Sequence, residues 1–171
     1  MNTEGIAEAF DLFLKAHNIN LRYYIVAADN LKRTVNFEKS YPICIIQNTD
    51  RLGNKGLHWT CYFFNQKGEY TFFDSMGKSP AFYGIETPPG KCIQTNNIKL
   101  QGDSNLCAGY VLWFLFQSCL GVGFFDVLKG FGRNVRKNDV NICMFLLELV
   151  KIFNVRRGGK TFFNHVRMAL L

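Results

Sequence analysis

One long apolar segment dominates the pattern of hydrophobic and polar positions in this chain. Between Leu106 and Leu120 only Gln117 and Ser118 are polar, and a helix that is apolar on every side has to lie inside a protein core. The segment is shorter than the ~20 residues that a membrane-spanning helix needs. The pattern therefore predicts a buried central helix, and no membrane span here.

Shorter segments on both sides follow the periods of amphipathic helices and of strands. Helices are predicted over residues 3–16, 139–153 and 161–170, and strands over residues 21–28, 43–47, 58–64, 70–74, 91–94 and 97–100. In the helix over 139–153, Asp139 is the predicted cap, and the apolar face is predicted to consist of Val140, Cys143, Met144, Leu147 and Val150. Residues 78–90 and 121–137 contain the Pro and Gly residues typical of irregular segments and surface loops.

The strands over 58–64 and 70–74 form the strongest hairpin signal in the chain, because only Asn65 to Glu69 separates them. Two registers fit this connection. If the turn centres on Gln66 and Lys67, residue 58 faces residue 75. If Gly68 forms a bulge, the register moves by one residue and places His58 diagonally from Asp74 on one face. In either register the imidazole and the carboxylate are neighbours.

A polar turn leads directly into the central helix and brings a thiol to its first turn. Asp103, Ser104 and Asn105 are N-cap candidates, which places Cys107 where the positive end of the helix dipole favours a thiolate. A single Cys on an apolar helix is usually a core residue. The residues upstream make a functional interpretation the stronger one.

Four side chains supply the parts that thiol-based catalysis requires. A cysteine nucleophile needs a base, a group that orients the base, and hydrogen-bond donors for the developing oxyanion. Cys107 would be the nucleophile, with His58 as its base. Asp74 would orient the imidazole, and the Gln101 side chain would form the oxyanion hole with the backbone amide of Cys107. This set predicts acyl-transfer chemistry at the start of the central helix.

The length, the cysteines and the first residues limit the class of protein. A chain of 171 residues fits a single domain. Its six cysteines contain no CxxC pair and lie mostly in apolar segments, which argues against a zinc site and against a disulfide framework. Residues 1–5 lack the basic and apolar regions of a secretory signal. We therefore expect an intracellular or particle-packaged monomer with reduced thiols, no metal and no small-molecule cofactor.

The positive charge is concentrated at the end of the chain. The last 51 residues carry nine Lys and Arg against three Asp and Glu, within a net charge of +7 for the whole sequence. This asymmetry favours a polyanionic partner, with nucleic acid as the first candidate, although a solvated basic surface is equally compatible with it. The candidate DNA contacts are Lys129, Arg133, Arg136, Lys137, Arg156, Arg157 and Lys160.

The motifs around the candidate site resemble those of the adenovirus endopeptidases (the adenain family) and the related ubiquitin-like-protein proteases. The matching segments are Gly56-Leu57-His58-Trp59, Phe72-Phe73-Asp74-Ser75-Met76-Gly77, and Gln101-Gly102 followed by Cys107-Ala108-Gly109-Tyr110. The order His, Asp, Gln, Cys is the reverse of the papain arrangement. Ile43 to Thr49 and Lys91-Cys92-Ile93 are similar to segments of the adenovirus branch, whereas Asp74 and Ala108 stand where that branch usually has Glu and Gly.

The resemblance implies a fold and an activity. Together with the predicted elements it implies an α+β fold, in which a mixed central sheet packs on the buried helix that carries the nucleophile. It further implies a papain-like cysteine endopeptidase of inverted order. Such an enzyme would cut viral precursor capsid or core proteins during particle maturation, in the virion and the host nucleus. Its cleavage sites would read Leu/Ile/Met-x-Gly-x before Gly, or end in Gly-Gly.

The same resemblance implies two activators and one internal cleavage site. Cys92 would form a disulfide with an activating viral peptide, and viral DNA would bind the basic residues. Leu128 to Gly132 also fits the cleavage pattern, with the scissile bond between Phe131 and Gly132. A chance match in a Gly-rich connector is the favoured interpretation of that segment.

Two other functions remain compatible with the sequence. One is a deubiquitinase or SUMO-type isopeptidase that uses the same triad on a Gly-Gly tail. The other is a basic, non-catalytic DNA-packaging protein in which His58 and Cys107 are core residues. Selective labelling of Cys107 by a thiol probe would exclude the second.

Overall fold

The protein is described by a computed structural model that covers residues 1–35, 37, 42–54 and 56–157. Five strands form one mixed sheet with the order β1-β2-β3-β4-β5. Their bounds are β1 Arg22–Val26, β2 Ile43–Asn48, β3 Trp59–Phe64, β4 Tyr70–Phe73 and β5 Cys92–Thr95. The two outer pairs, β1/β2 and β4/β5, are parallel, and the pairs β2/β3 and β3/β4 are antiparallel. Residues 97–100, predicted as a strand-like piece, lie outside the sheet.

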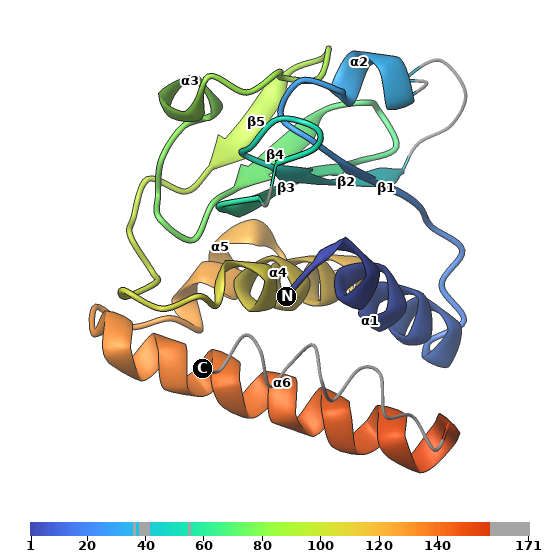
Figure 1. Cartoon of the computed structure of the whole chain (residues 1–171), viewed down its shortest axis with the longest axis vertical. Coiled ribbons are helices and arrows are strands. Elements are labelled where there is room, and N and C mark those ends of the chain that lie inside the picture. Colours follow the sequence, from blue (N-terminus) through green and yellow to red (C-terminus); the bar gives the residue numbers. More distant parts are fainter. Residues whose placement is uncertain (36, 38–41, 55, 158–171) are drawn as a thin grey trace.

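Helices cover both faces of this sheet, as Figure 1 shows. On one face lie α1 (Thr3–Ala16) and α4 (Cys107–Cys119), with α5 (Phe124–Lys129) beside α4, and the long helix α6 (Val135–Arg157) forms a further layer beneath them. The short helices α2 (Leu31–Thr34) and α3 (Pro80–Tyr83) lie toward the opposite face. The predicted α+β fold, with a mixed sheet packed on a buried central helix, is confirmed.

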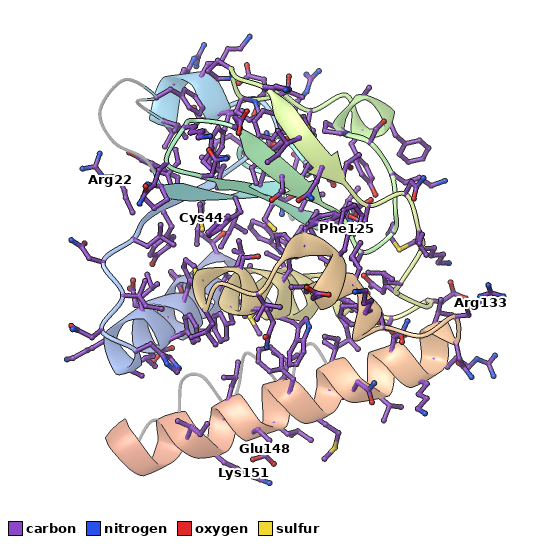
Figure 2. The ribbon with its side chains drawn as sticks, turned by 180° about the vertical axis from the view of Figure 1, so that it is seen from behind. Arg22, Cys44, Phe125, Arg133, Glu148 and Lys151 are labelled. Carbon is purple, nitrogen blue, oxygen red and sulfur yellow. The ribbon has the colours of Figure 1, made fainter. Side chains whose placement is uncertain are left out.

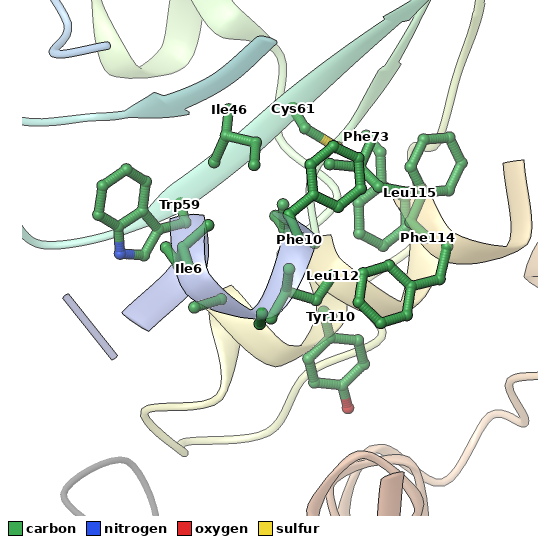
Figure 3. Close-up of a cluster of buried hydrophobic side chains, with 14 of the residues drawn as sticks. Ile6, Phe10, Ile46, Trp59, Cys61, Phe73, Tyr110, Leu112, Phe114 and Leu115 are labelled. Atoms are coloured by element: carbon green, nitrogen blue, oxygen red, sulfur yellow. The ribbon is translucent and has the colours of Figure 1, made fainter. Parts of the chain in front are cut away.

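Aromatic side chains fill the space between the sheet and the central helix (Figure 3). Phe114 of α4 stacks on Phe73 of β4 with ring centroids 4.5 Å apart, and Phe116 stacks on Phe13 of α1 at 3.8 Å. Alternate residues of the strands point to a second, smaller apolar cluster under α2. Because the sheet is covered on both faces, the three middle strands β2, β3 and β4 are buried almost throughout.

The β3/β4 hairpin adopts the bulged one of the two predicted registers. Gly68 has a φ of 75°, a left-handed conformation that suits glycine, and the backbone N–H of Asn65 donates to the carbonyl of Glu69 at 2.9 Å. Cys61 pairs with Phe73 in the ladder. Continuing this register puts residue 60 opposite Asp74, so His58 lies diagonally from the carboxylate.

Two predictions about the last third of the chain are wrong. Residues 124–129 form the helix α5 with Phe124 and Val127 buried, so residues 121–137 are not a surface loop. The helix α6 begins at Val135, earlier than predicted, and the side chain of Asn134 accepts a hydrogen bond from the backbone N–H of Lys137 at 3.1 Å. Residues 161–170, predicted as a short helix, lie outside the described residues.

The apolar face predicted for α6 is mostly the solvent-facing one. Val140 and Met144 are 60% and 53% exposed, whereas Ile142 and Leu146 are buried. The cause lies in α4, where Gly109 leaves room for a close approach: a Cβ atom there would be 2.7 Å from Ile142 and 3.0 Å from Leu146. Both sides of α6 carry apolar residues, and the contact with Gly109 selects the buried one. Within the described part of the chain, no helix is both long and apolar enough to cross a membrane.

Candidate active site

Four segments bring the predicted site residues to one end of the central helix. His58 directly precedes β3, Asp74 directly follows β4, and Cys107 is the first residue of α4. The predicted caps are wrong: the N-cap position is Leu106, and no side chain caps the helix. The turn is organised instead by Gln101, whose Nε2 donates to the carbonyl of Ser104 at 2.5 Å. The first amides of α4 are therefore left without a side-chain cap.

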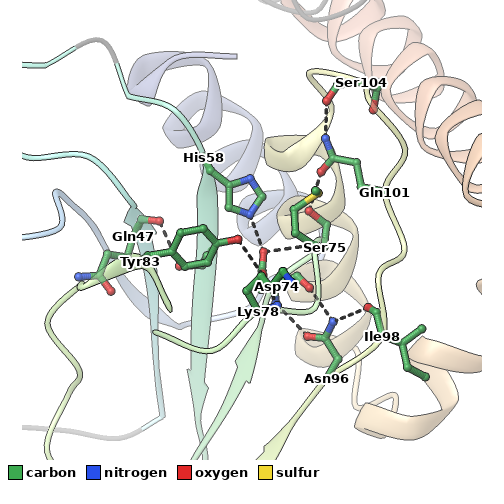
Figure 4. Close-up of polar contacts among 12 residues, drawn as sticks. Gln47, His58, Asp74, Ser75, Lys78, Tyr83, Asn96, Ile98, Gln101 and Ser104 are labelled. Atoms are coloured by element: carbon green, nitrogen blue, oxygen red, sulfur yellow. Dashed lines mark hydrogen bonds and ion pairs between the residues drawn. The ribbon is translucent and has the colours of Figure 1, made fainter. Parts of the chain in front are cut away.

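His58 and Asp74 form a close pair, shown in Figure 4. The Nε2 atom of His58 lies 2.5 Å from Oδ1 of Asp74, and the Asp74 side chain is 0% exposed. The second carboxylate oxygen accepts hydrogen bonds from the backbone N–H of Lys78 at 2.7 Å and from the hydroxyl of Tyr83 at 3.0 Å. These donors offset the desolvation of the carboxylate. Since Nε2 faces Asp74, Nδ1 is the imidazole nitrogen left for the thiol.

His58 and Cys107 shift each other's protonation toward an ion pair. Burial alone would lower the pKa of His58, but its hydrogen bonds to Asp74 and Cys107 and the charges of both raise that pKa to about 9. Burial would raise the pKa of Cys107, but the hydrogen bond to His58, the charge of His58 and the backbone N–H of Trp59 lower it. The arrangement therefore favours a thiolate beside an imidazolium, the reactive form of a thiol nucleophile.

Gln101 is held so that its amide group lies at the start of α4. Its Oε1 atom accepts a hydrogen bond from the hydroxyl of Ser75 at 2.6 Å, while Nε2 donates to Ser104. The carbonyl of Ser75 accepts from the backbone N–H groups of Leu100 and Gln101 at 2.8 and 3.1 Å. With one Nε2 hydrogen on Ser104, the other remains for a substrate oxygen.

A cleft of about 900 Å³ opens over these residues. Its walls combine the predicted site with apolar and polar neighbours, and include His58, Gln101, Cys107, Leu57, Trp59, Met76, Phe82, Tyr83, Lys78 and Asp103. A second hollow of about 340 Å³ shares Met1, Gly56 and Trp59 with the first. This volume lies within the usual range for ligand-binding clefts.

Sequence reasoning missed three residues that hold Asp74 and Gln101. Tyr83 bonds to Asp74, and its ring centroid lies 5.5 Å from that of His58. Asn96 fixes the backbone of Asp74, because its Oδ1 accepts from the Asp74 N–H at 2.9 Å and its Nδ2 donates to the Asp74 carbonyl at 2.6 Å. Ser75 orients Gln101. Tyr83 and Asn96 come from segments without a distinctive pattern, although Ser75 lies inside a motif quoted above.

The residues predicted to bind activators lie away from this cluster. Cys92 is exposed on β5, an edge strand. Partial burial raises the pKa of Cys92, and two backbone hydrogen bonds only partly offset this. Lys129 pairs with Asp126 at 2.7 Å, whereas Arg133, just before α6, and Arg136 and Lys137, in its first turn, are exposed.

The structure describes only some of the remaining candidate residues. It does not describe the side chains of Arg156 and Arg157 or any part of Lys160. Phe131 packs against Tyr110 and Trp113, and both backbone groups of Gly132 bond to Asn138, so the bond between Phe131 and Gly132 is not presented on an open loop. The described residues include no group of three His, Cys, Asp or Glu side chains arranged to hold a metal ion.

Iodoacetamide is expected to alkylate Cys107 faster than Cys92 near neutral pH. The pKa of the Cys107 thiol is lowered and that of Cys92 is raised, and each pKa unit changes the thiolate fraction about tenfold. At pH 7 we expect Cys107 to be alkylated at least roughly tenfold faster than Cys92. This difference in rate should narrow as pH rises and Cys92 deprotonates. Peptide mapping by mass spectrometry over pH 5–9 measures both sites. Identical pH profiles would contradict the ion pair.

Comparison with known proteins gives a likeness of fold. No protein-family model matches the chain, and no curated protein sequence matches it. Among solved structures, the fold is similar to that of the ASFV pS273R protease, with a TM-score of 0.55 and 15% sequence identity over 81% of this chain. This chain covers 64% of the length of that protease chain.

Proposed function

We propose that this chain is a viral cysteine endopeptidase. The observation that carries the proposal is the pairing of His58 with the buried carboxylate of Asp74 at 2.5 Å, next to a thiol at the start of α4. The resemblance of the motifs to the adenain family and the likeness of fold to a viral protease support it. Both alternatives, an isopeptidase and a non-catalytic packaging protein, become outcomes of the experiments below.

The proposed reaction uses each of the four side chains in turn. The Cys107 thiolate attacks the carbonyl carbon of the scissile peptide bond, and the oxyanion receives hydrogen bonds from the Gln101 amide and the Cys107 backbone N–H. The His58 imidazolium gives its proton to the leaving amine, so the C–N bond breaks and a thioester remains. His58 then takes a proton from water, whose oxygen attacks the thioester carbonyl; the C–S bond breaks, the acid is released, and the thiolate–imidazolium pair forms again. Asp74 holds the imidazole in place throughout.

The proposed substrates are viral precursor capsid or core proteins, cut during maturation in the virion and the host nucleus by a monomeric enzyme. Fluorogenic peptides of the Leu-x-Gly-Gly type test this, beside ubiquitin and SUMO substrates and with a Cys107→Ala variant as the control. Cleavage of the peptides alone supports the endopeptidase. Preference for ubiquitin or SUMO supports the isopeptidase, and no cleavage together with an unreactive Cys107 supports the packaging protein.

We also propose that duplex DNA binds at the start of α6, where Arg133 projects from the body of the protein (Figure 2). With Arg136 and Lys137 it forms an exposed basic group. Affinity is expected to fall with salt, with a log-log slope of about −0.9 for each phosphate neutralised. Changing all three residues to Gln should flatten the slope, whereas Lys67→Gln at the hairpin turn should not. A flat salt dependence of the wild type, measured by fluorescence anisotropy, would refute this site.

Cys92 is proposed to form a mixed disulfide with a cysteine-containing viral peptide. Its position on an edge strand supports this, because an added peptide strand could pair with β5. In this step the Cys92 thiolate attacks a disulfide of the oxidised peptide, and the other sulfur of that disulfide leaves as a thiolate. Because partial burial raises the pKa of Cys92, this exchange should be slow near neutral pH. Equal activity of wild type and Cys92→Ser with and without such peptides, under mild oxidation, would dismiss the switch and leave the protease assignment untouched.

A further inference from the structure

Two residues near the start of α6 form hydrogen bonds with the segment that carries Gln101. Asn138 is 1% exposed, and its Nδ2 atom donates to the carbonyl of Leu100 at 3.0 Å and to that of Gly132 at 2.9 Å. Its Oδ1 atom accepts from the backbone N–H of Gly132 at 3.0 Å. The bond to its carbonyl holds Leu100, the residue immediately before Gln101, against α6.

The next residue of α6 holds the other side of Gln101. Both carboxylate oxygens of Asp139 lie 3.2 Å from the backbone nitrogen of Gly102, whose N–H points to them. The hydroxyl of Tyr110 lies 2.8 Å from Oδ1 of Asp139 and 3.1 Å from the carbonyl of Leu100, so its proton serves both acceptors. A Cβ atom on residue 102 would be 2.6 Å from Oδ2 of Asp139, so the carboxylate would have to move away from any other residue there.

Gln101 therefore lies between two anchors of different origin. Ser75, which follows the triad acid, holds its backbone N–H and its Oε1 atom, and α6 holds the residues on either side of it. Asp139 is not among the residues that line the cleft. It bears on the site through the backbone of the segment it holds and through the hydroxyl of Tyr110 on α4.

We propose that Asp139 is a positioning residue for the oxyanion donor Gln101, a role that rests on the proposed protease function. A charged acceptor forms a stronger hydrogen bond to a backbone N–H than a neutral one, and oxyanion stabilisation depends on donors held in place before the charge develops. Losing this anchor lets Gly102 and Gln101 move relative to the thiol. The transition state is then less stabilised, whereas the affinity for substrate and the His58–Cys107 ion pair stay unchanged.

The test compares a reaction that develops an oxyanion with one that does not. In Asp139→Ala we expect kcat for peptide hydrolysis to fall by about tenfold or more, less than on removal of the donor itself, with KM within about twofold. Alkylation of Cys107 by iodoacetamide, a displacement at carbon without an oxyanion, should keep its wild-type rate and pH profile. Asp139→Asn, which retains one acceptor oxygen, should give an intermediate kcat.

Two further variants test whether a lower kcat in Asp139→Ala reflects only a loss of protein stability. Tyr110→Phe removes one donor to Asp139 and leaves the buried ring in place, so it should lower kcat by a smaller factor with an unchanged alkylation rate. Asp126→Ala removes the exposed carboxylate of the α5 surface pair and should leave kcat unchanged. A thermal melt of each variant shows whether it is folded at the assay temperature.

The outcomes separate this proposal from the proposed function. If the wild type hydrolyses no peptide, the protease assignment fails and the role of Asp139 fails with it. If the wild type is active and folded Asp139→Ala matches it within twofold, only the positioning role is wrong. A parallel loss of alkylation and hydrolysis also overturns it, because Asp139 would then support the whole site. Should Asp139→Ala not fold, wild-type kcat in both Tyr110→Phe and Asp139→Asn would overturn it.

Discussion

Cys107→Ala is expected to abolish peptide cleavage and leave the protein folded. Removing the nucleophile of a triad costs roughly 10⁶-fold in turnover in a well-studied protease, so activity should fall below detection. The side chain is small and 9% exposed at the first position of α4, beside Ala108. We therefore expect the free energy of unfolding to change by only about 1 kcal/mol. Activity and a thermal melt measure the two effects.

A matched variant at the far end of the same helix controls for the loss of a thiol. Cys119 is half-buried at the last position of α4, so Cys119→Ala changes the same atoms on the same element. It should retain wild-type turnover. Cleavage that persists at the wild-type rate in Cys107→Ala would remove Cys107 from the mechanism, whatever Cys119→Ala does.

Gln101→Ala should lower kcat by roughly 100-fold or more with little change in KM, because the amide acts mainly on the oxyanion of the transition state. The variant also leaves the buried hydroxyl of Ser75 without its acceptor, which costs about 1–3 kcal/mol of stability. A melting curve is therefore needed beside the kinetics. Steady-state measurement of kcat and KM on a folded sample gives the result.

Gln101→Glu keeps one structural contact of the side chain and removes its amide donor. Glutamate still accepts the hydrogen bond from Ser75, but it loses the bond to the Ser104 carbonyl and places negative charge where the oxyanion forms. Its kcat should therefore be at least as low as that of Gln101→Ala. Gln66→Ala, at the exposed hairpin turn, should have no effect. Wild-type kcat in Gln101→Glu would remove the amide from the oxyanion hole.

The part of the site that the sequence predicts best is local. His58 and Asp74 are joined by a short hairpin, and the only open question there was the register, which Gly68 decides. The central helix was equally clear, because α4 is apolar on nearly every side. The hairpin and the helix can be predicted from the spacing of hydrophobic residues and from the residues of the turn, and both are visible in the sequence.

What the sequence does not reveal depends on distant partners. Tyr83 reaches Asp74 from a short helix inside a segment that reads as irregular. Asp139 reads as a helix cap, because a carboxylate near a helix start usually is one, but its partners are Gly102 and Tyr110 on other elements. The buried face of α6 is the one that packs against Gly109. The spacing of hydrophobic residues along α6 does not distinguish this face from the other apolar face.

The two anchors of Gln101 also differ in when they can form during synthesis. Ser75 and its carbonyl follow the β3/β4 hairpin and precede the central helix in the chain, whereas Asn138 and Asp139 are made about thirty residues after Cys107. A nascent chain therefore contains its acid, base and thiol before α6 can hold the oxyanion segment. In the proposed endopeptidase, translation order thus delays a fully assembled oxyanion site until the start of α6 has been made.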